Sequence, residues 1–379
     1  MDYFTFHVLA LLIFDLIILL ISLINLFTLK RINNFPEIKE YPKVSILVPA
    51  RNEEDSIEKC IISLLNQNYP SFEVIVLNDN SADRTGMILE SIKKKYENLI
   101  IINGNEKPKE WIGKNWACHQ LSQKAEGELY LFTDADTYHK ENSLVNAVNC
   151  FMYKKLDLLT VIPKQIVKSW SEQFIIPIMH WSILSFLPIK LAEKVKSPKL
   201  QITIGQYMLF RGSKYQKMGG HETIKTEIID DMPLGRLTKS LGYKWGIADG
   251  SDNIECRMYK NFKEVYNGFT RTLFCVFNYN IPIFLWVWFF LALVAIQPIV
   301  IIFLFLLNIE IPRLILIFSI LTLFLSFLLW AISIIRFKYP KYLILIYPIT
   351  MLMILIIAIR SMYQTLTGKI KWKGRSIEK

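Results

Sequence analysis

Two stretches of the chain are too long and too apolar to belong to an ordinary soluble domain. Residues 8–27 are almost wholly apolar, and residues 281–360 carry long runs of isoleucine, leucine, phenylalanine and tryptophan, with short breaks at 308–313 and 336–341. Each run approaches the roughly 20 residues that a helix needs to cross a bilayer. The sequence therefore predicts an N-terminal transmembrane anchor within residues 1–30 and C-terminal transmembrane helices within 281–360.

The first apolar stretch contains one charged residue, Asp15. About sixteen apolar residues at roughly 0.3 to 0.6 kcal/mol each outweigh its cost of roughly 2.5 to 3.5 kcal/mol, so insertion is favoured. The alternative is a cleaved signal peptide, but the basic start and small-residue cleavage site of such a peptide are missing. Asp15 is either a functional intramembrane group or a residue turned toward a neighbouring helix.

The chain is basic, with 44 Lys+Arg against 33 Asp+Glu in 379 residues. Many basic residues flank the apolar runs, which favours a membrane partner over nucleic acid. Lys30 and Arg31 follow the first run, so the domain at 31–275 is expected in the cytoplasm of a multi-pass cell-membrane protein. Three later crossings would leave the basic tail at 361–379 outside the cell, although positively charged segments next to membrane helices favour the cytoplasm. The number of late crossings therefore stays open, since one segment could be re-entrant or 281–307 not a simple crossing.

Five scattered cysteines without a C-x-x-C pair fit a reducing compartment.

Between the apolar stretches, short runs of valine, isoleucine and leucine alternate with helix-like polar segments. The runs are 44–49, 73–77, 99–102, 129–133 and 158–162. Such alternation predicts an α/β domain with a mostly parallel sheet, whose ligands gather at the carboxyl ends of the strands. A further apolar stretch, 174–191, would separate those ends from later motifs if it crossed the bilayer. We expect it to be an interfacial helix instead.

Polar clusters follow three of the expected strands, at 49–54 (PARNEE), 78–85 (NDNSADRT) and 133–136 (TDAD). No glycine-rich dinucleotide fingerprint and no phosphate-binding P-loop is present. Asp134 and Asp136 stand one residue apart after a hydrophobic strand. Hard divalent cations such as Mg²⁺ and Mn²⁺ take oxygen ligands and bridge to substrate phosphates, so the pair predicts a metal-diphosphate site. The alternative is a solvated strand end.

The ordered set of motifs 44–54, 78–85, 111–117 (WIGKNWA) and 134–136 resembles the family 2 glycosyltransferases of GT-A fold, a Rossmann-like fold. The likeness covers about residues 40 to 275, with 205–220 and 230–235 resembling the acceptor-side stretch and acidic pair of that family. Within the family, the chain is similar to membrane enzymes that glycosylate lipids or carotenoids, of the diaponeurosporenoate, hopene-associated and ceramide types. Residues 257–259 and 372–375 add to that likeness.

The resemblance implies a nucleotide-sugar donor and assigns residues to it. Pro49, Glu53 and Asp79 fall where the family grips the base and ribose; helix capping is the alternative. Lys114 is expected to stabilise diphosphate charge, unless it is an ordinary surface lysine. Arg257 is expected either at the diphosphate or at the membrane surface.

The acids carry the expected chemistry. Asp134 is assigned to the ribose or metal and Asp136 to the metal. Asp231 is assigned as the general base that takes the acceptor's proton. Asp230 is the rival for that role and otherwise a substrate-binding residue. The alternative for both acids is helix N-terminal charge.

The expected activity is the inverting transfer of a hexose from a nucleotide sugar to a lipid, isoprenoid or carotenoid acceptor. UDP-glucose is the donor that we expect. A processive polysaccharide synthase is the first alternative, although the Q-x-x-R-W motif of such enzymes is broken, with Ile254 and Tyr259 in place of its Gln and Trp. A noncatalytic membrane scaffold is the second. His221 and Glu222 are adjacent rather than a helical turn apart, so no zinc site is assigned.

Overall fold

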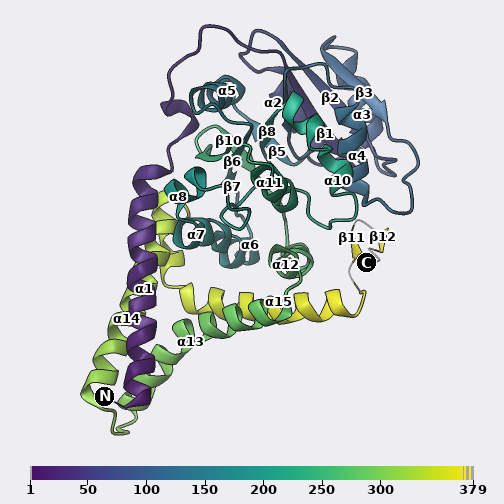
Figure 1. Cartoon of the computed structure of the whole chain (residues 1–379). Coiled ribbons are helices and arrows are strands. Elements are labelled where there is room, and N and C mark those ends of the chain that lie inside the picture. Colours follow the sequence, from purple (N-terminus) through teal and green to yellow (C-terminus); the bar gives the residue numbers. More distant parts are fainter. Residues whose placement is uncertain (1, 370, 373–374, 377–379) are drawn as a thin grey trace.

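The computed structural model describes residues 2–369, 371–372 and 375–376. An α/β domain sits above a group of long helices (Figure 1). Within the described residues, seven strands form the main sheet in the order β3-β2-β1-β4-β8-β6-β9, and β8 alone runs antiparallel to its neighbours. The strands are β1 (Val44–Ala50), β2 (Phe72–Asn78), β3 (Leu99–Asn103), β4 (Leu129–Phe132), β6 (Leu158–Ile162), β8 (Met208–Arg211) and β9 (Trp245–Asp249).

The five expected strand runs are confirmed as β1, β2, β3, β4 and β6. Their near-continuous apolar sequences reflect burial on both faces, as parallel strands covered by helices require. Alternate residues of β1 show this directly, because Ile46 and Val48 pack into one hydrophobic cluster and Leu47 into the other. The first cluster includes α2 (Ile57–Leu65), α3 (Thr85–Lys93) and α5 (Ser143–Tyr153); the second includes α4 (Gly113–Ser122), α9 (Gly212–Lys217) and α11 (Asp231–Ser240).

A small second sheet closes the domain over the carboxyl ends of the main strands. It consists of β5 (Thr137–His139), β10 (Ile254–Cys256) and β7 (Lys164–Gln165) in that order. The loop that holds Asp134 and Asp136 joins β4 of the main sheet to β5 of this one. The pair is therefore fixed from both sides by strands. The short helix α10 (Gly220–Thr223) packs beside α4.

The stretch 174–191 differs from the single interfacial helix that we expected. It is divided among α6 (Trp170–Ile175), α7 (Pro177–Phe186) and α8 (Ile189–Lys194). The breaks fall at Pro177 and Pro188, since proline lacks the N–H that a helix interior needs. The side-chain amide of Asn25 donates to the carbonyls of Leu184 (2.8 Å) and Leu187 (2.6 Å), so α7 is tied to the first long helix.

Among the described residues, four helices are long and apolar enough to cross a membrane. They are α1 (Tyr3–Thr28), α13 (Ile281–Leu306), α14 (Arg313–Arg336) and α15 (Tyr347–Leu366). The carboxylate of Asp15 in α1 accepts a hydrogen bond from the Ser326 hydroxyl of α14 (2.8 Å), which confirms that it is turned toward a neighbouring helix. The remaining elements are η1 (Ile32–Asn34), α12 (Phe262–Val276), η2 (Lys341–Ile344), β11 (Lys371–Trp372) and β12 (Arg375–Ser376).

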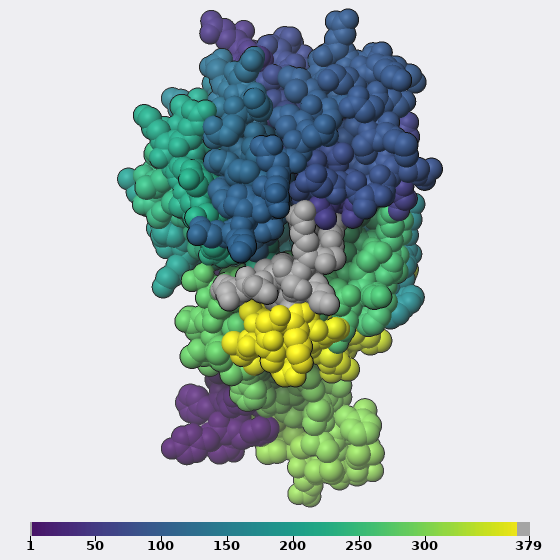
Figure 2. All heavy atoms as spheres, turned by 90° about the vertical axis from the view of Figure 1, so that its right-hand side faces the viewer, coloured from purple at the N-terminus to yellow at the C-terminus, as the bar shows by residue number. Residues whose placement is uncertain are grey.

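The five cysteines are free and buried. The tail motif 372–375 falls partly outside the described residues, because 373 and 374 are not among them. In the space-filling view of Figure 2, the yellow α15 lies at a level between the α/β domain above and the purple start of α1 below.

Candidate active site

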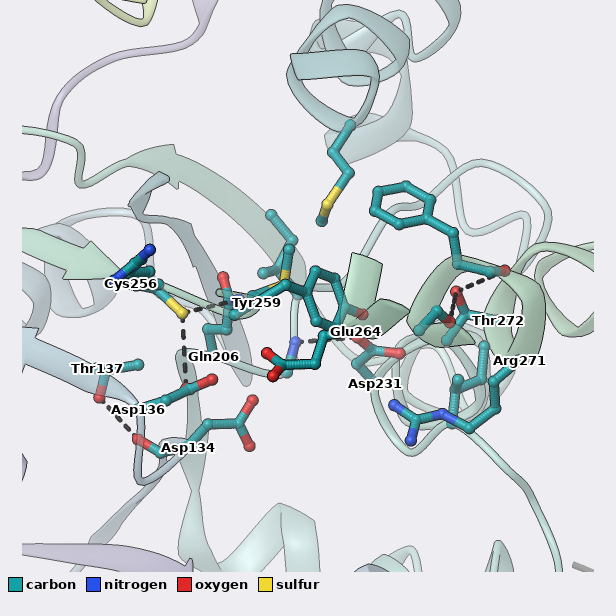
Figure 3. A pocket seen from close by; sticks show the side chains of 18 of the residues that line it. Asp134, Asp136, Thr137, Gln206, Asp231, Cys256, Tyr259, Glu264, Arg271 and Thr272 are labelled. Atoms are coloured by element: carbon teal, nitrogen blue, oxygen red, sulfur yellow. Dashed lines mark hydrogen bonds between the residues drawn. The ribbon is translucent and has the colours of Figure 1, made fainter. Parts of the chain in front are cut away.

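One cavity of about 1790 Å³ takes in every residue to which the sequence assigned a donor, metal or catalytic role. The motifs that carry them are as far apart in the chain as Pro49 and Arg257, and the sheet brings them together at the carboxyl ends of β1, β2 and β4. Several of the acids face one another across this space (Figure 3). The residues concerned are Pro49, Glu53, Asp79, Lys114, Asp134, Asp136, Asp230, Asp231 and Arg257.

Lys114 lies between two of the acids. It belongs to the first turn of α4, and its Nζ is 2.8 Å from Asp134 Oδ1 and 3.2 Å from Asp230 Oδ1. Burial disfavours the charge of an ammonium group, but the two carboxylates outweigh that effect and raise the pKa of Lys114 well above its usual value. A permanent cation therefore stands at the centre of the acidic group.

Asp136 has a different environment. Burial, and then the negative charges of Asp134 and Glu53, raise the pKa of Asp136 to about 7. The Cys256 thiol lies 3.5 Å from its Oδ1 and donates to it, because burial and the neighbouring acid raise the pKa of Cys256 and keep it protonated. Asp136 is thus a buried acid with two other acids nearby, and a further cation would favour its ionised form.

Asp231 is the first residue of α11 and is held by backbone donors. The N–H of Gly205 donates to Oδ2 (3.0 Å) and that of Met232 to Oδ1 (2.7 Å). Burial and the adjacent Asp230 nevertheless raise the pKa of Asp231 to about 6. A Cβ on Gly205 would stand 3.3 Å from Asp231 Oδ2 and 3.4 Å from Lys114 Nζ, so the close approach depends on glycine.

Asp230 has the opposite tendency, although it is adjacent in the chain. Burial opposes its ionisation, but Lys114 and His221 hold the pKa of Asp230 well below its usual range. Neighbouring acids with pKa values pushed apart are a common arrangement in catalytic sites. The sequence could not separate these two acids, whereas their surroundings do.

His221 contacts this group and was given no role by the sequence. The Tyr215 hydroxyl accepts the backbone N–H of His221 (3.1 Å) and lies 2.6 Å from its Nδ1. Nε2 of the same ring lies 3.6 Å from Asp230 Oδ2. Burial lowers the pKa of His221, so the ring is neutral. No local pattern in the sequence signals this contact, because Tyr215 and His221 meet Asp230 only in the folded domain.

The donor-side loops are joined by Arg51. Its guanidinium donates to the Asp79 carbonyl (2.5 Å) and lies 3.6 Å from the Asp79 carboxylate. The Glu53 N–H donates to the Thr85 hydroxyl (2.8 Å). These bonds connect the loop after β1 to the loop after β2, so that Glu53 and Asp79 line one wall of the cavity.

Arg257 lines the cavity but is committed to a carboxylate. Its Nε donates to Glu172 Oε1 (2.9 Å) and its Nη2 lies 3.4 Å from Oε2. The Glu172 side chain has no exposed area, whereas the Arg257 side chain keeps 30% of its area exposed. Arg257 accordingly anchors α6 to the segment after β10, which is a structural task beyond those that the sequence suggested.

The far end of the cavity is apolar. Apolar side chains of α7, α13 and α15 line this end, and α12 adds both apolar and charged ones, among them Glu264 and Arg271. The residues of α13 and α15 concerned are Val287, Trp288, Leu291, Met351 and Ile354. The same hollow thus runs from a charged end inside the α/β domain to an apolar end among helices that are long enough to cross a membrane.

The chemistry of the donor set suits a hard divalent cation at Asp134 and Asp136. Both offer carboxylate oxygens to the cavity, and Asp134 and Glu53 add negative charge near the buried Asp136. A second group of potential ligands, Cys118, His221 and Asp230, is close enough to hold an ion among the described residues. The Lys114 ammonium beside Asp230 already supplies the positive charge there, so we assign no metal to that group.

Comparisons with known proteins define the class. Residues 45–219 match the family model "Glycosyl transferase family 2". A mannosyltransferase, PcManGT from Pyrobaculum calidifontis, solved with GDP-Man and Mn²⁺, is 16% identical and covers 96% of this chain and 98% of its own with a TM-score of 0.59. The segment 45–219 therefore matches the family 2 glycosyltransferases, and the expected GT-A fold is confirmed.

A curated relative extends the comparison. The chain is 26% identical over 234 residues to 4,4'-diaponeurosporenoate glycosyltransferase of Staphylococcus aureus (strain USA300), a match that covers 61% of this chain and 60% of that relative. The chain thus matches about three fifths of that relative's length. TarS 1–349 of S. aureus, solved with UDP, is 21% identical over 60% of this chain and 63% of its own, with a TM-score of 0.42 that adds nothing to the fold assignment.

Proposed function

We propose that the protein is an inverting glycosyltransferase that moves a hexose from a nucleotide sugar to a membrane lipid or to an isoprenoid acceptor of the carotenoid type. UDP-glucose is the donor that we propose. One observation carries the proposal. The acids and Lys114 share a single cavity with apolar side chains of α7, α13 and α15. A water-soluble donor and a membrane-dissolved acceptor can meet only in a site with both kinds of wall.

The reaction that we propose is one displacement. The acceptor oxygen attacks the anomeric carbon while the bond from that carbon to the diphosphate oxygen breaks, and the nucleoside diphosphate leaves with the electron pair. Asp231 takes the proton of the acceptor hydroxyl. Its pKa of about 6 suits this task, because the carboxylate is ionised at neutral pH yet remains a better proton acceptor than an ordinary aspartate. A single displacement inverts the anomeric centre.

The other charged residues would serve the donor. Glu53 and Asp79 line the wall where the base and ribose would lie, and Lys114 is placed to neutralise diphosphate charge. Held by Asp134 and Asp136, Mg²⁺ or Mn²⁺ would supply further positive charge to the leaving diphosphate. Asp230 remains ionised and fixes Lys114, which suits a positioning role better than that of the base.

We further propose that the catalytic domain lies in the cytoplasm. Lys30, Arg31, Arg336 and Lys338 flank the ends of α1 and α14 that touch this domain, as the bias of positive charge toward the cytoplasm requires. A nucleotide sugar made in the cytoplasm then reaches the charged end of the cavity directly.

The test separates donor binding from transfer. Purified protein in lipid nanodiscs with Mn²⁺ is given labelled UDP-glucose and a lipid extract, and we measure both donor binding and labelled lipid. Asp231→Asn should abolish transfer and leave donor binding nearly unchanged, whereas Asp136→Ala should weaken metal-dependent donor binding.

Glu126→Gln is the control, because Glu126 is an exposed residue that pairs with Lys43 away from the cavity. Equal loss of donor binding in both aspartate variants would contradict the separate roles. A long sugar polymer as product would instead indicate a processive synthase, and failure of the wild-type protein to bind or hydrolyse any nucleotide sugar would indicate a scaffold.

A further inference from the structure

Three of the four long helices form a bundle with two distinct ends. At one end, the Arg336 guanidinium at the close of α14 donates to the carbonyl of Leu29, just after α1, and pairs with Asp249 of β9 at 2.5 Å. At the other end, Val8 of α1 packs with Ile301 of α13 and Ile315 of α14. The first end touches the α/β domain, and we call it the domain end; the second is the far end. α1 and α14 run toward the domain end and α13 runs away from it (Figure 1).

α15 does not connect these two ends. The ring of its first residue, Tyr347, lies tilted beside those of Phe327 (5.5 Å between ring centroids) and Trp330 (6.0 Å), both in the half of α14 that leads to the domain end. Near its other end, the Ser361 hydroxyl accepts the backbone N–H of Phe274 in α12 (3.0 Å). A 20-residue helix is about 30 Å long, so a crossing would carry its second end to the far end of the bundle.

The middle of α15 supports the same orientation. Ala358 packs with Phe284, in the first turn of α13, and with Phe274 of α12. Both ends of α15 therefore lie at the level where the spans meet the α/β domain. Figure 1 shows the helix running nearly perpendicular to α1 beneath the domain, and Figure 2 shows it between the domain and the far end of the bundle.

Two opposite faces of α15 have different neighbours. The buried residues recur at spacings of three and four, and so do the exposed apolar ones, which places each set on one side of the helix. The buried set is Tyr347, Thr350, Met351, Ile354, Ile357, Ala358 and Ser361. The exposed set, which we call the α15 stripe, is Ile349, Leu352, Ile356, Ile359, Tyr363 and Leu366.

The charge on α15 points away from the stripe. Arg360 is the one charged residue between 347 and 366, and its guanidinium lies 4.1 Å from the ring centroid of Tyr266 in α12. Leu285, Trp286 and Phe289 at the start of α13 are exposed apolar residues as well. On the opposite side, Met351 and Ile354 line the cavity. α15 thus separates the cavity from the surface on which the stripe lies.

We propose that α15 lies in the plane of the membrane surface, with the α15 stripe buried in the acyl chains of the leaflet next to the catalytic domain, while α1, α13 and α14 cross the bilayer. α1 brings the chain to the catalytic side, α13 then takes it across the bilayer, and α14 returns it to the catalytic side before α15 begins. Lys341 and Lys369, which flank α15, then lie on the same side as Lys30 and Arg336, and the conflict between the basic tail and the charge rule disappears. The inference does not depend on which sugar or acceptor the protein uses.

Site-directed labelling in cells tests the number of crossings. Single cysteines replace Glu310 in the exposed loop between α13 and α14, Thr367 just after α15, and Glu126 on the catalytic domain. A membrane-impermeant maleimide should label Glu310→Cys on one side of the membrane, and Thr367→Cys together with Glu126→Cys on the other. The wild-type protein gives the background, since its cysteines are buried. Labelling of Thr367→Cys on the same side as Glu310→Cys would overturn the proposal.

The depth of the helix is a second measurement on the full chain in vesicles. Nitroxides at Ile349, Leu352, Ile356 and Ile359 report collision rates with oxygen and with a water-soluble nickel complex. We expect one shallow depth at all four positions. Nitroxides at Ile317, Leu321 and Phe324, exposed positions of α14, are the matched control and should grow deeper toward the bilayer centre. The same progression of depth along α15 would show that it crosses and would refute the inference.

Discussion

The two ends of the cavity are built on different principles. At the charged end, a few side chains are fixed by direct contacts, such as Lys114 between Asp134 and Asp230. At the apolar end, α7, α13 and α15 contribute mostly apolar side chains. Directional contacts select one geometry of a diphosphate and sugar, whereas an apolar wall accepts many chain shapes of similar size. We therefore expect strict recognition of the donor and tolerant recognition of the acceptor.

After the loss of the base itself, the largest effect should follow from removing the central cation. Lys114→Met retains the apolar stem and deletes the charge that faces the diphosphate. We expect kcat/KM for the donor to fall about 100-fold, as when one preorganised electrostatic contact is lost. Lys225→Met is the matched control, because Lys225 pairs with exposed Glu110. Steady-state kinetics with a fixed acceptor measure the change, and equal rates in the two variants would remove Lys114 from the site.

A change at the apolar end should be smaller and depend on the acceptor. Met179→Gln in α7 keeps the length of a side chain that lines the cavity and makes it polar. For a long-chain acceptor we expect KM to rise about tenfold, which corresponds to the loss of roughly one or two buried methylene contacts. A short-chain acceptor serves as the control and should be unaffected. A similar rise for both acceptors would mean that the apolar end does not hold the acceptor chain.

The charged end should also set the pH dependence. Asp231 must be ionised to take a proton, so kcat/KM at saturating Mn²⁺ should rise as pH increases through about 6. Because Asp230 contributes to the raised pKa of Asp231, Asp230→Asn should move this midpoint to lower pH. A pH-rate profile of both proteins gives the result, and an unchanged or higher midpoint would show that Asp230 does not act on the base.

The smallest effect should come from the neutral histidine behind Asp230. His221→Gln replaces a ring nitrogen that lies 3.6 Å from the Asp230 carboxylate, and we expect kcat to fall about threefold, as for the loss of roughly 0.65 kcal/mol of electrostatic contact. Tyr215→Phe, which removes the hydroxyl that orients the ring, should act in the same direction. If His221 positions Asp230, both variants also shift the midpoint of the pH-rate profile. A loss of thermal stability without that shift would make the residue purely structural.

The sequence predicted most of what depends on buried strands and local motifs. β6 has the predicted limits, and the acids after β1, β2 and β4 meet because parallel strands end at one edge. What it missed depends on contacts between distant segments. The proline breaks that divide 174–191 were visible, yet only packing against α1 shows how the pieces lie. The pairing of Arg257 with Glu172 and the contact of His221 with Asp230 join residues from separate elements, so no local pattern reveals them.

The ion pair between Asp249 and Arg336 has a consequence for how the protein works in a membrane. It fastens the outermost strand of the main sheet to the last turn of α14, a helix long and apolar enough to cross a membrane, and the Asp249 side chain has no exposed area. The sheet is therefore held at a fixed tilt and height over the lipid instead of turning freely on a tether. On the proposed function, only molecules residing in the adjacent monolayer can be glycosylated. How quickly an acceptor flips between monolayers would then limit product formation in living cells.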